Sequence, residues 1–200
     1  MENSNIKGKG YFTKFLALVM VLSINAFTFN VQAQTAFKLM EGSQIKVLGT
    51  SNIHDWTMLA KTFSMDGALV MKSGQLQDVS ALNFVLPVKN LKSNESLMDT
   101  RAYKAMNAEK FNKMTFKLTE AIVVPQQKTI KVIGNLTIGG VTNKIEIKAS
   151  YLINGDETIT LKGSKAIKMS DYNIKAPSFM MGALKTGNDL IIDMLLKLKY

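Results

Sequence analysis

The chain has 200 residues, a formal net charge of +10 and no cysteine. Without cysteine, the protein has no disulfides, iron–sulfur clusters, thiol catalysis or cysteine-based zinc sites. A basic balance is compatible with binding nucleic acid, with an anionic membrane surface or with simple solubility.

The N-terminal segment has the order of features of a secretory signal peptide. Lys7, Lys9 and Lys14 precede an apolar run over residues 15–29, and a small-residue site follows that ends at Ala33. The run is shorter than the roughly 20 apolar residues that span a membrane. We therefore expect a signal peptide over residues 1–33, cleaved near Ala33, with no transmembrane span. The mature protein would be one domain over residues 34–200, either periplasmic or secreted.

The remaining chain alternates apolar and polar residues with the period of a half-buried strand. Met114, Phe116 and Leu118 fall on one face, and Thr115 and Lys117 fall on the other. Similar strands are predicted, in chain order, over residues 43–49, 56–61, 63–72, 79–88, 128–138, 144–153, 158–162 and 192–199.

About eight or nine antiparallel strands with one solvated face are therefore predicted. Most lysines lie on this polar face and are spread evenly, so nucleic-acid binding is not expected. A sheet of this size avoids free edges by closing into a barrel. A barrel of about eight strands holds its own side chains or one small ligand. Alternation does not decide between a filled barrel, a hollow barrel and a sandwich.

One segment, residues 93–110, lacks strand alternation and is predicted as an amphipathic helix. Ser93 or Asn94 is the candidate cap, and Glu95 and Asp99 suit the positive N-terminal end. The predicted apolar stripe, with Tyr103 beside it, consists of Leu97, Met98, Ala102, Ala105 and Met106. Such a helix either plugs the barrel or acts as a lid over a ligand site.

Three later segments carry a resemblance to a known family. Residues 134–144 (GNLTIGGVTNK) resemble the strand–turn–strand signature of the YceI-like proteins, and residues 170–174 (SDYNI) are similar to a later segment of that family. Residues 114–116 (MTF) occupy the place of its strand after the helix. The resemblance implies a mainly β fold, an extended lipocalin-like antiparallel barrel with one inserted helix. It also implies export and a long isoprenoid or acyl lipid in an apolar cavity. Asn173 departs from the glycine usual in the family.

Under this interpretation, the inward faces of the strands and the helix would line a lipid cavity. The loop after Pro177 would fold over its mouth, or simply cap the barrel. The candidate lipid-binding residues are Val47, Trp56, Phe84, Met98, Tyr103, Met106, Phe116, Leu118, Ile147, Phe179, Met180 and Leu196.

No catalytic or metal site is predicted. His54 is the only histidine, and Asp55 beside it would point to the opposite face of a strand, so a triad is not expected. His54 is interpreted as a structural or surface residue, or as a polar contact at the cavity mouth. Trp56 is either a core aromatic or part of the cavity wall.

Three functions stay open at this point. The first is an exported binding protein for a long-chain lipid or isoprenoid, which needs no cofactor. The second is a structural or interaction barrel that its own side chains fill. The third, an unrecognised lipid enzyme, would require an activity that depends on His54. Association into a homodimer is neither required nor excluded.

Overall fold

The structure is a computed structural model that describes residues 34–200, except for the side chains of Phe179 and Met180. The predicted signal peptide, residues 1–33, lies outside the described residues. Among the described residues, none of the helices has the length and apolar character needed to cross a bilayer.

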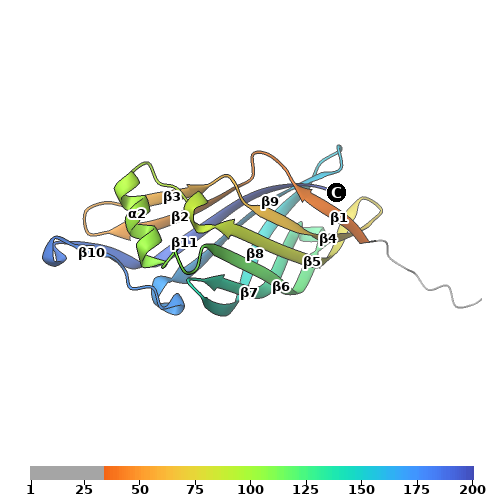
Figure 1. The fold of residues 1–200 in the computed structure, drawn as a ribbon. Coiled ribbons are helices and arrows are strands. Elements are labelled where there is room, and N and C mark those ends of the chain that lie inside the picture. The colour runs from red at the N-terminus through yellow and green to blue at the C-terminus, as the bar shows by residue number, and fades with distance from the viewer. Residues whose placement is uncertain (1–33) are drawn as a thin grey trace, which may run out of the picture. The chain divides into compact units, whose positions relative to one another are not determined.

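Eleven strands and one α-helix make up the described chain (Figure 1). Short 3₁₀ turns η2 (Val88–Asn90), η3 (Pro125–Gln127), η4 (Met169–Tyr172) and η5 (Met180–Gly182) connect them. The strands and the helix are β1 (Gln34–Leu39), β2 (Gln44–Ser51), β3 (Trp56–Ala60), β4 (Ser64–Lys72), β5 (Gln75–Pro87), α2 (Ser96–Ala105), β6 (Lys113–Val124), β7 (Thr129–Ile138), β8 (Val141–Ile153), β9 (Thr158–Lys168), β10 (Ser178–Phe179) and β11 (Leu184–Lys199).

The strands form a closed antiparallel barrel of eight strands, as predicted. The path runs β1-β4-β5-β6-β7-β8-β9-β11, and β11 returns to β1 through the pairs Lys38↔Lys199 and Leu39↔Leu198. β2 and β3 continue the wall beyond β1 and β4, because β2 pairs with the other half of β11. Closure leaves few free strand edges. The alternation of apolar and polar residues alone did not establish that the sheet closes.

Most strands begin and end close to the predicted residues, since each has one apolar face. The predictions missed β1, the second half of β9 and the first half of β11. β1 is short, and Gly163 and Gly187 interrupt the apolar pattern of the other two. The segment at residues 178–182 is a small hairpin, in which β10 pairs with β11 through Ser178↔Lys185.

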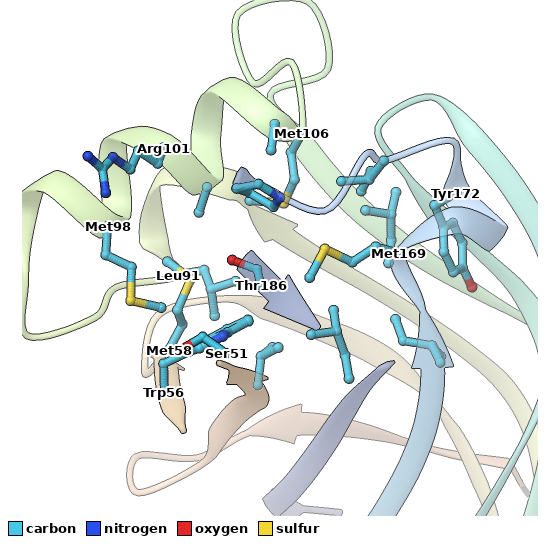
Figure 2. A pocket seen from close by; sticks show the side chains of 18 of the residues that line it. Ser51, Trp56, Met58, Leu91, Met98, Arg101, Met106, Met169, Tyr172 and Thr186 are labelled. Carbon is cyan, nitrogen blue, oxygen red and sulfur yellow. The ribbon is translucent and has the colours of Figure 1, made fainter. Parts of the chain in front are cut away.

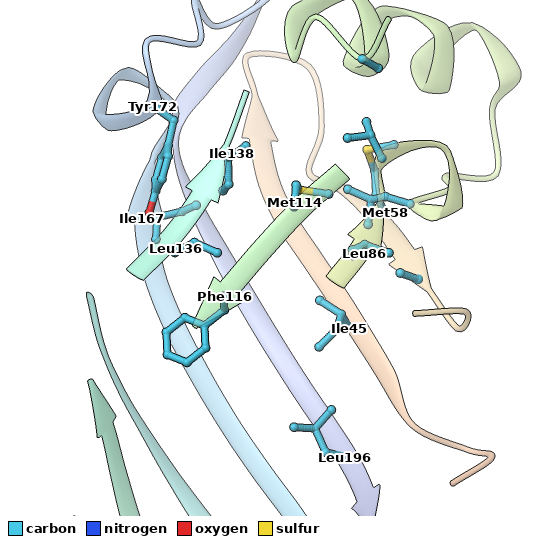
Figure 3. Close-up of a cluster of buried hydrophobic side chains, with 14 residues drawn as sticks. Ile45, Met58, Leu86, Met114, Phe116, Leu136, Ile138, Ile167, Tyr172 and Leu196 are labelled. Atoms are coloured by element: carbon cyan, nitrogen blue, oxygen red, sulfur yellow. The ribbon is translucent and has the colours of Figure 1, made fainter. Parts of the chain in front are cut away.

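The barrel interior has two apolar clusters at opposite ends. We call the end that α2 covers the mouth, and the opposite end, where the C-terminus lies, the packed end (Figure 1). Every residue of the cluster at the packed end is at most 5% exposed: Phe37, Leu69, Leu76, Val79, Ile130, Tyr151, Ile159 and Leu198. The cluster nearer the mouth includes Ile45, Met58, Leu86, Met114, Phe116, Leu136, Ile138, Ile167, Tyr172 and Leu196 (Figure 3).

Several aromatic rings lie on glycines of the neighbouring strand, among them those of Trp56 and Phe116. A Cβ added to Gly49 would overlap the ring of Trp56, its partner across β2 and β3. A Cβ on Gly134 would overlap the ring of Phe116 in the same way. Because glycine has no side chain, each ring occupies the space beside the strand that the side chain of a larger residue would fill.

One part of the barrel wall is not hydrogen-bonded across. β8 and β9 pair only as far as Lys148↔Ser164, although β8 stays paired with β7 up to Val141 and β9 stays paired with β11 up to Lys168. We call the facing unpaired segments, residues 141–147 of β8 and 165–168 of β9, the seam. Near the end of the seam, a hydrogen bond connects β8 to η4, since the Asn143 amide donates to the Asp171 carbonyl at 2.7 Å.

The helix is shorter than predicted, and its start differs. The N-cap is Glu95, without a capping hydrogen bond from its side chain, so Ser93 and Asn94 are not the cap. The buried Asp99 carboxylate instead accepts hydrogen bonds from the backbone N–H and hydroxyl of Ser93, at 2.6 and 2.7 Å. Leu97 is 58% exposed and does not belong to the inward stripe.

Candidate functional site

A cavity of about 210 Å³, here called the upper cavity, lies under α2 at the mouth. From α2, Met98, Ala102, Ala105 and Met106 line it. Met58 of β3 and Met169 of η4 lie on the strand side of the same cavity (Figure 2). With Met114, five methionines line the cavity. Methionine is flexible and polarizable, so this wall can adapt to an apolar ligand of irregular shape.

Polar groups gather at the rim of the upper cavity: Ser51, His54, Glu95, Arg101 and Thr186. His54 is exposed in the loop between β2 and β3, and its Nδ1 lies 2.9 Å from the Asp55 carbonyl oxygen. Trp56 also lines the cavity, and its indole N–H donates to the Thr50 carbonyl at 3.0 Å. A wet rim over an apolar wall suits an amphipathic molecule.

A second cavity of about 140 Å³, here called the inner cavity, lies deeper in the barrel. Inward residues of both clusters line it, among them Phe84, Phe116, Ile147 and Leu196. Four residues, Val47, Met114, Ile138 and Ile192, line both cavities. Movement of these four side chains would join the two cavities into one interior space.

Eight of the twelve predicted site residues line these cavities. Val47 lines both, Trp56, Met98 and Met106 line the upper one, and Phe84, Phe116, Ile147 and Leu196 line the inner one.

The other four predicted residues lie elsewhere or are not described. Leu118 packs between the clusters without lining a cavity. Tyr103 belongs to α2 but lines neither cavity, and its hydroxyl donates to the Leu91 carbonyl at 2.8 Å, so it holds α2 to the chain before it. The side chains of Phe179 and Met180 lie outside the described part of the structure.

Several lining residues were not predicted. Met58, Met114 and Met169 are inward residues whose role needed the closed barrel to become visible. Tyr172, in the SDYNI segment, lines the upper cavity and is 2% exposed. Burial raises the pKa of its hydroxyl above 10.0, and the nearby Asp171 charge raises it further, while the Asn143 side chain lowers it. Lys165 lines the inner cavity, and the alternation of β9 was the signal for it.

The described residues contain no group of three or more acidic or histidine side chains placed to hold a metal ion. What the site offers is a closed apolar interior with an adaptable wall and a polar rim. This is the geometry of a barrel with room for an apolar ligand.

Comparison with known proteins agrees with this class. A family model described as a YceI-like domain matches residues 27–198, so the chain belongs to the YceI-like family. No curated protein sequence matches the chain.

Solved structures have the same fold at low sequence identity. BcnA of Burkholderia cenocepacia is 16% identical, with a TM-score of 0.65 over 78% of this chain and 95% of BcnA. A polyisoprenoid binding domain from Saccharophagus degradans, described as implicated in plant cell wall breakdown, is 12% identical, with a TM-score of 0.60 over 84% of this chain and 99% of that domain. A YceI protein of Campylobacter jejuni is 17% identical, with a TM-score of 0.55 over 68% of this chain and 81% of its own.

Proposed function

We propose that the protein is an exported binding protein that holds the apolar chain of a long lipid, an isoprenoid or a fatty-acyl chain, inside its barrel. The observation that carries this proposal is the pair of apolar cavities that share Val47, Met114, Ile138 and Ile192. The isoprenoid-binding relative with the same fold supports it. The function needs no cofactor, and binding rather than catalysis is its purpose.

The energetics favour a long chain. Each buried methylene contributes about 0.8 kcal/mol. Association first costs roughly 4–15 kcal/mol of lost translational and rotational freedom. About ten to twenty buried carbons are therefore needed for useful affinity. A short-chain amphiphile would gain too little from the same cavity.

In this proposal, α2 is the lid of the upper cavity. It places Met98 and Met106 over the strands (Figure 2), and it is attached at its start by Asp99 and along its side by Tyr103. The helix is therefore a packed but separate layer, which can move without breaking the barrel's hydrogen-bonded wall. The N-terminal segment would direct export, and the N-terminal residue of the exported form would then lie near Gln34.

The test is native mass spectrometry of the protein purified without detergent from the exported fraction of its own cells. We expect extra mass that organic extraction removes, and the extract identifies the lipid. A bare protein mass, together with no binding of added long-chain isoprenoids or fatty acids, would instead establish a barrel filled by its own side chains.

A matched pair of variants locates the ligand. Ala102→Phe introduces a ring into the upper cavity, whereas Leu97→Phe introduces the same ring on the exposed side of the same helix. We expect the first variant to lose most of the bound lipid and the second to retain it. Equal retention in both folded variants would place the lipid outside the upper cavity.

A further inference from the structure

One lysine of β9, Lys165, lies on the strand face that points into the barrel. Along β9, Leu161, Gly163 and Lys165 line the inner cavity, and Ile167 continues the same inward row into the upper cavity. Lys162 and Lys168 of the same strand are exposed. Lys165 is half-buried, and it is the only charged or polar side chain that lines the inner cavity within the described chain.

The charge of Lys165 is not balanced by the protein. Within residues 34–200 its ammonium makes no hydrogen bond or ion pair, and Glu146 of the facing β8 segment is engaged by Lys131 and Lys148 at 3.6 and 3.7 Å. An ammonium beside an apolar cavity costs free energy unless it reaches water or an anion. The seam begins at this residue, so the side chain that lines the cavity stands on backbone that has no hydrogen-bonded neighbour on the β8 side.

A second polar group lies on η4, the turn that follows β9. The Tyr172 hydroxyl is buried and has no hydrogen-bond partner of good geometry among the described residues, although the Asn143 side chain is close enough to lower its pKa. In Figure 3 the Tyr172 side chain extends from η4, and its hydroxyl points toward Ile167 of β9. Ile167 is two residues from Lys165, which is about 7 Å along a strand. Buried hydroxyls are nearly always hydrogen-bonded, so an unpartnered one calls for an explanation.

We propose that the seam is a binding site for an anionic oxygen head group, a carboxylate or a phosphate, of the lipid held in the barrel. The inference rests on the proposed function and adds the chemistry of the ligand's polar end. The Lys165 ammonium supplies the counter-charge and the Tyr172 hydroxyl donates a hydrogen bond. Lys165 pairs across β9 and β11 with Ile192, which lines both cavities, so a chain that starts at the seam has apolar space on either side.

Such a site discriminates by charge. A hydrogen bond between an ionised donor and an ionised acceptor is stronger than a neutral one, and the low dielectric of the barrel wall strengthens it further. An alcohol or amide of the same chain length gains the apolar contacts but not the ion pair. A carboxylate and a phosphate share the required chemistry, and the experiment separates them.

The experiment measures the affinity of the purified full-length exported protein, after extraction of bound lipid, for two pairs of probes. One pair is a C16 fatty acid and its alcohol, and the other is an isoprenyl phosphate and its isoprenol. Lys165→Met removes the charge with little change in length. Lys162→Met removes the same charge from the exposed face of the same strand and is the matched control.

We expect the wild-type protein to bind an acidic probe about tenfold to a hundredfold more tightly than its alcohol. Lys165→Met should abolish this preference, and Lys162→Met should keep it. Tyr172→Phe should reduce the preference by severalfold while leaving the protein at least as stable, because it removes an unpartnered buried hydroxyl. The preferred acid identifies the carboxylate or the phosphate as the head group.

Two results would overturn the inference in distinguishable ways. If both members of each pair bind equally well, or if Lys165→Met keeps the acid preference, the seam is not a head-group site while the lipid-binding function stands. If no probe and no extracted lipid binds the wild-type protein, the proposed function fails and the head-group site fails with it.

Discussion

The two ends of the barrel use the same alternating strands for different purposes. At the packed end, Leu76 and Ile159 are 0% exposed, and with most of their cluster they enclose the small, wholly apolar inner cavity. At the mouth, most lining residues are half-buried, methionines replace branched aliphatic residues, and a helix rather than a strand covers them. The packed end thus stabilises the fold around a narrow apolar space, whereas the mouth has the larger and more adaptable space.

The largest expected effect comes from opening a cavity at the packed end. Leu76→Ala should lower the free energy of unfolding by about 2–5 kcal/mol, because a fully buried side chain is lost and the rigid wall cannot collapse around it. Leu97→Ala, at an exposed position of α2, should change it by less than about 0.5 kcal/mol. Urea unfolding of both variants measures this contrast. Similar values for the two variants would mean that the packed end is not the stabilising region.

The next effect, at the mouth, concerns the ring of Trp56. Gly49→Ala places a methyl group where this ring lies, so the ring must move at a cost of about 1–3 kcal/mol. Trp56 is the only tryptophan, so the emission maximum reports the movement directly. Gly155→Ala is the control, since a methyl group there meets open space. Unchanged emission in Gly49→Ala would show that the ring does not rest on Gly49.

A smaller effect is expected where the helix is attached. Asp99→Ala removes the acceptor of two hydrogen bonds from Ser93 and should cost about 0.5–2 kcal/mol. Asp99→Asn keeps a side-chain oxygen in place and should cost less. Amide hydrogen exchange in α2 should accelerate in Asp99→Ala, while exchange in β5 stays slow. Equal acceleration in both elements would contradict a separately attached lid.

The smallest effect is the alkaline pH dependence from Tyr172. Its pKa is raised in the folded protein, mainly by burial, so the unfolded chain loses this proton first as the pH rises. The protonated Tyr172 hydroxyl therefore contributes to the free energy of unfolding in full below about pH 10. This contribution is lost as the pH rises through the folded pKa, at no more than about 1.4 kcal/mol per pH unit. Tyr172→Phe should show a shallower decline in urea midpoints between pH 9 and pH 11. The same slope as in the wild type would contradict the prediction.

Much of this arrangement could be predicted from the sequence, because each interior strand has one apolar face. Met114 and Phe116 revealed their inward direction through alternation alone, and the apolar stripe of α2 identified Met98 and Met106. Such reasoning works wherever one face is buried, since a slip of one residue would reverse the whole strand.

The rest depended on tertiary structure. Leu97 is apolar yet exposed, because a short helix that covers a mouth presents only one narrow face to it. The seam follows from how far β8 and β9 run together, which no local pattern records. Lys165 interrupts the apolar face of β9, and Gly163 precedes it on the same face. The predicted strand therefore ended before Lys165, and the inward position of this lysine was missed.

The pairing of β11 has a consequence for the order in which the chain acquires structure. β11, the last strand of the domain, hydrogen-bonds with β9, β2 and β1, so the barrel closes only when this strand is in place. Such non-local pairing is slow to form, because a long loop must close before any contact is made. A growing or translocating chain that has not yet released residues 184–199 cannot close its wall. In the export that we propose, this late closure would keep the chain unfolded while it is threaded across a membrane, and the barrel would be completed on the far side.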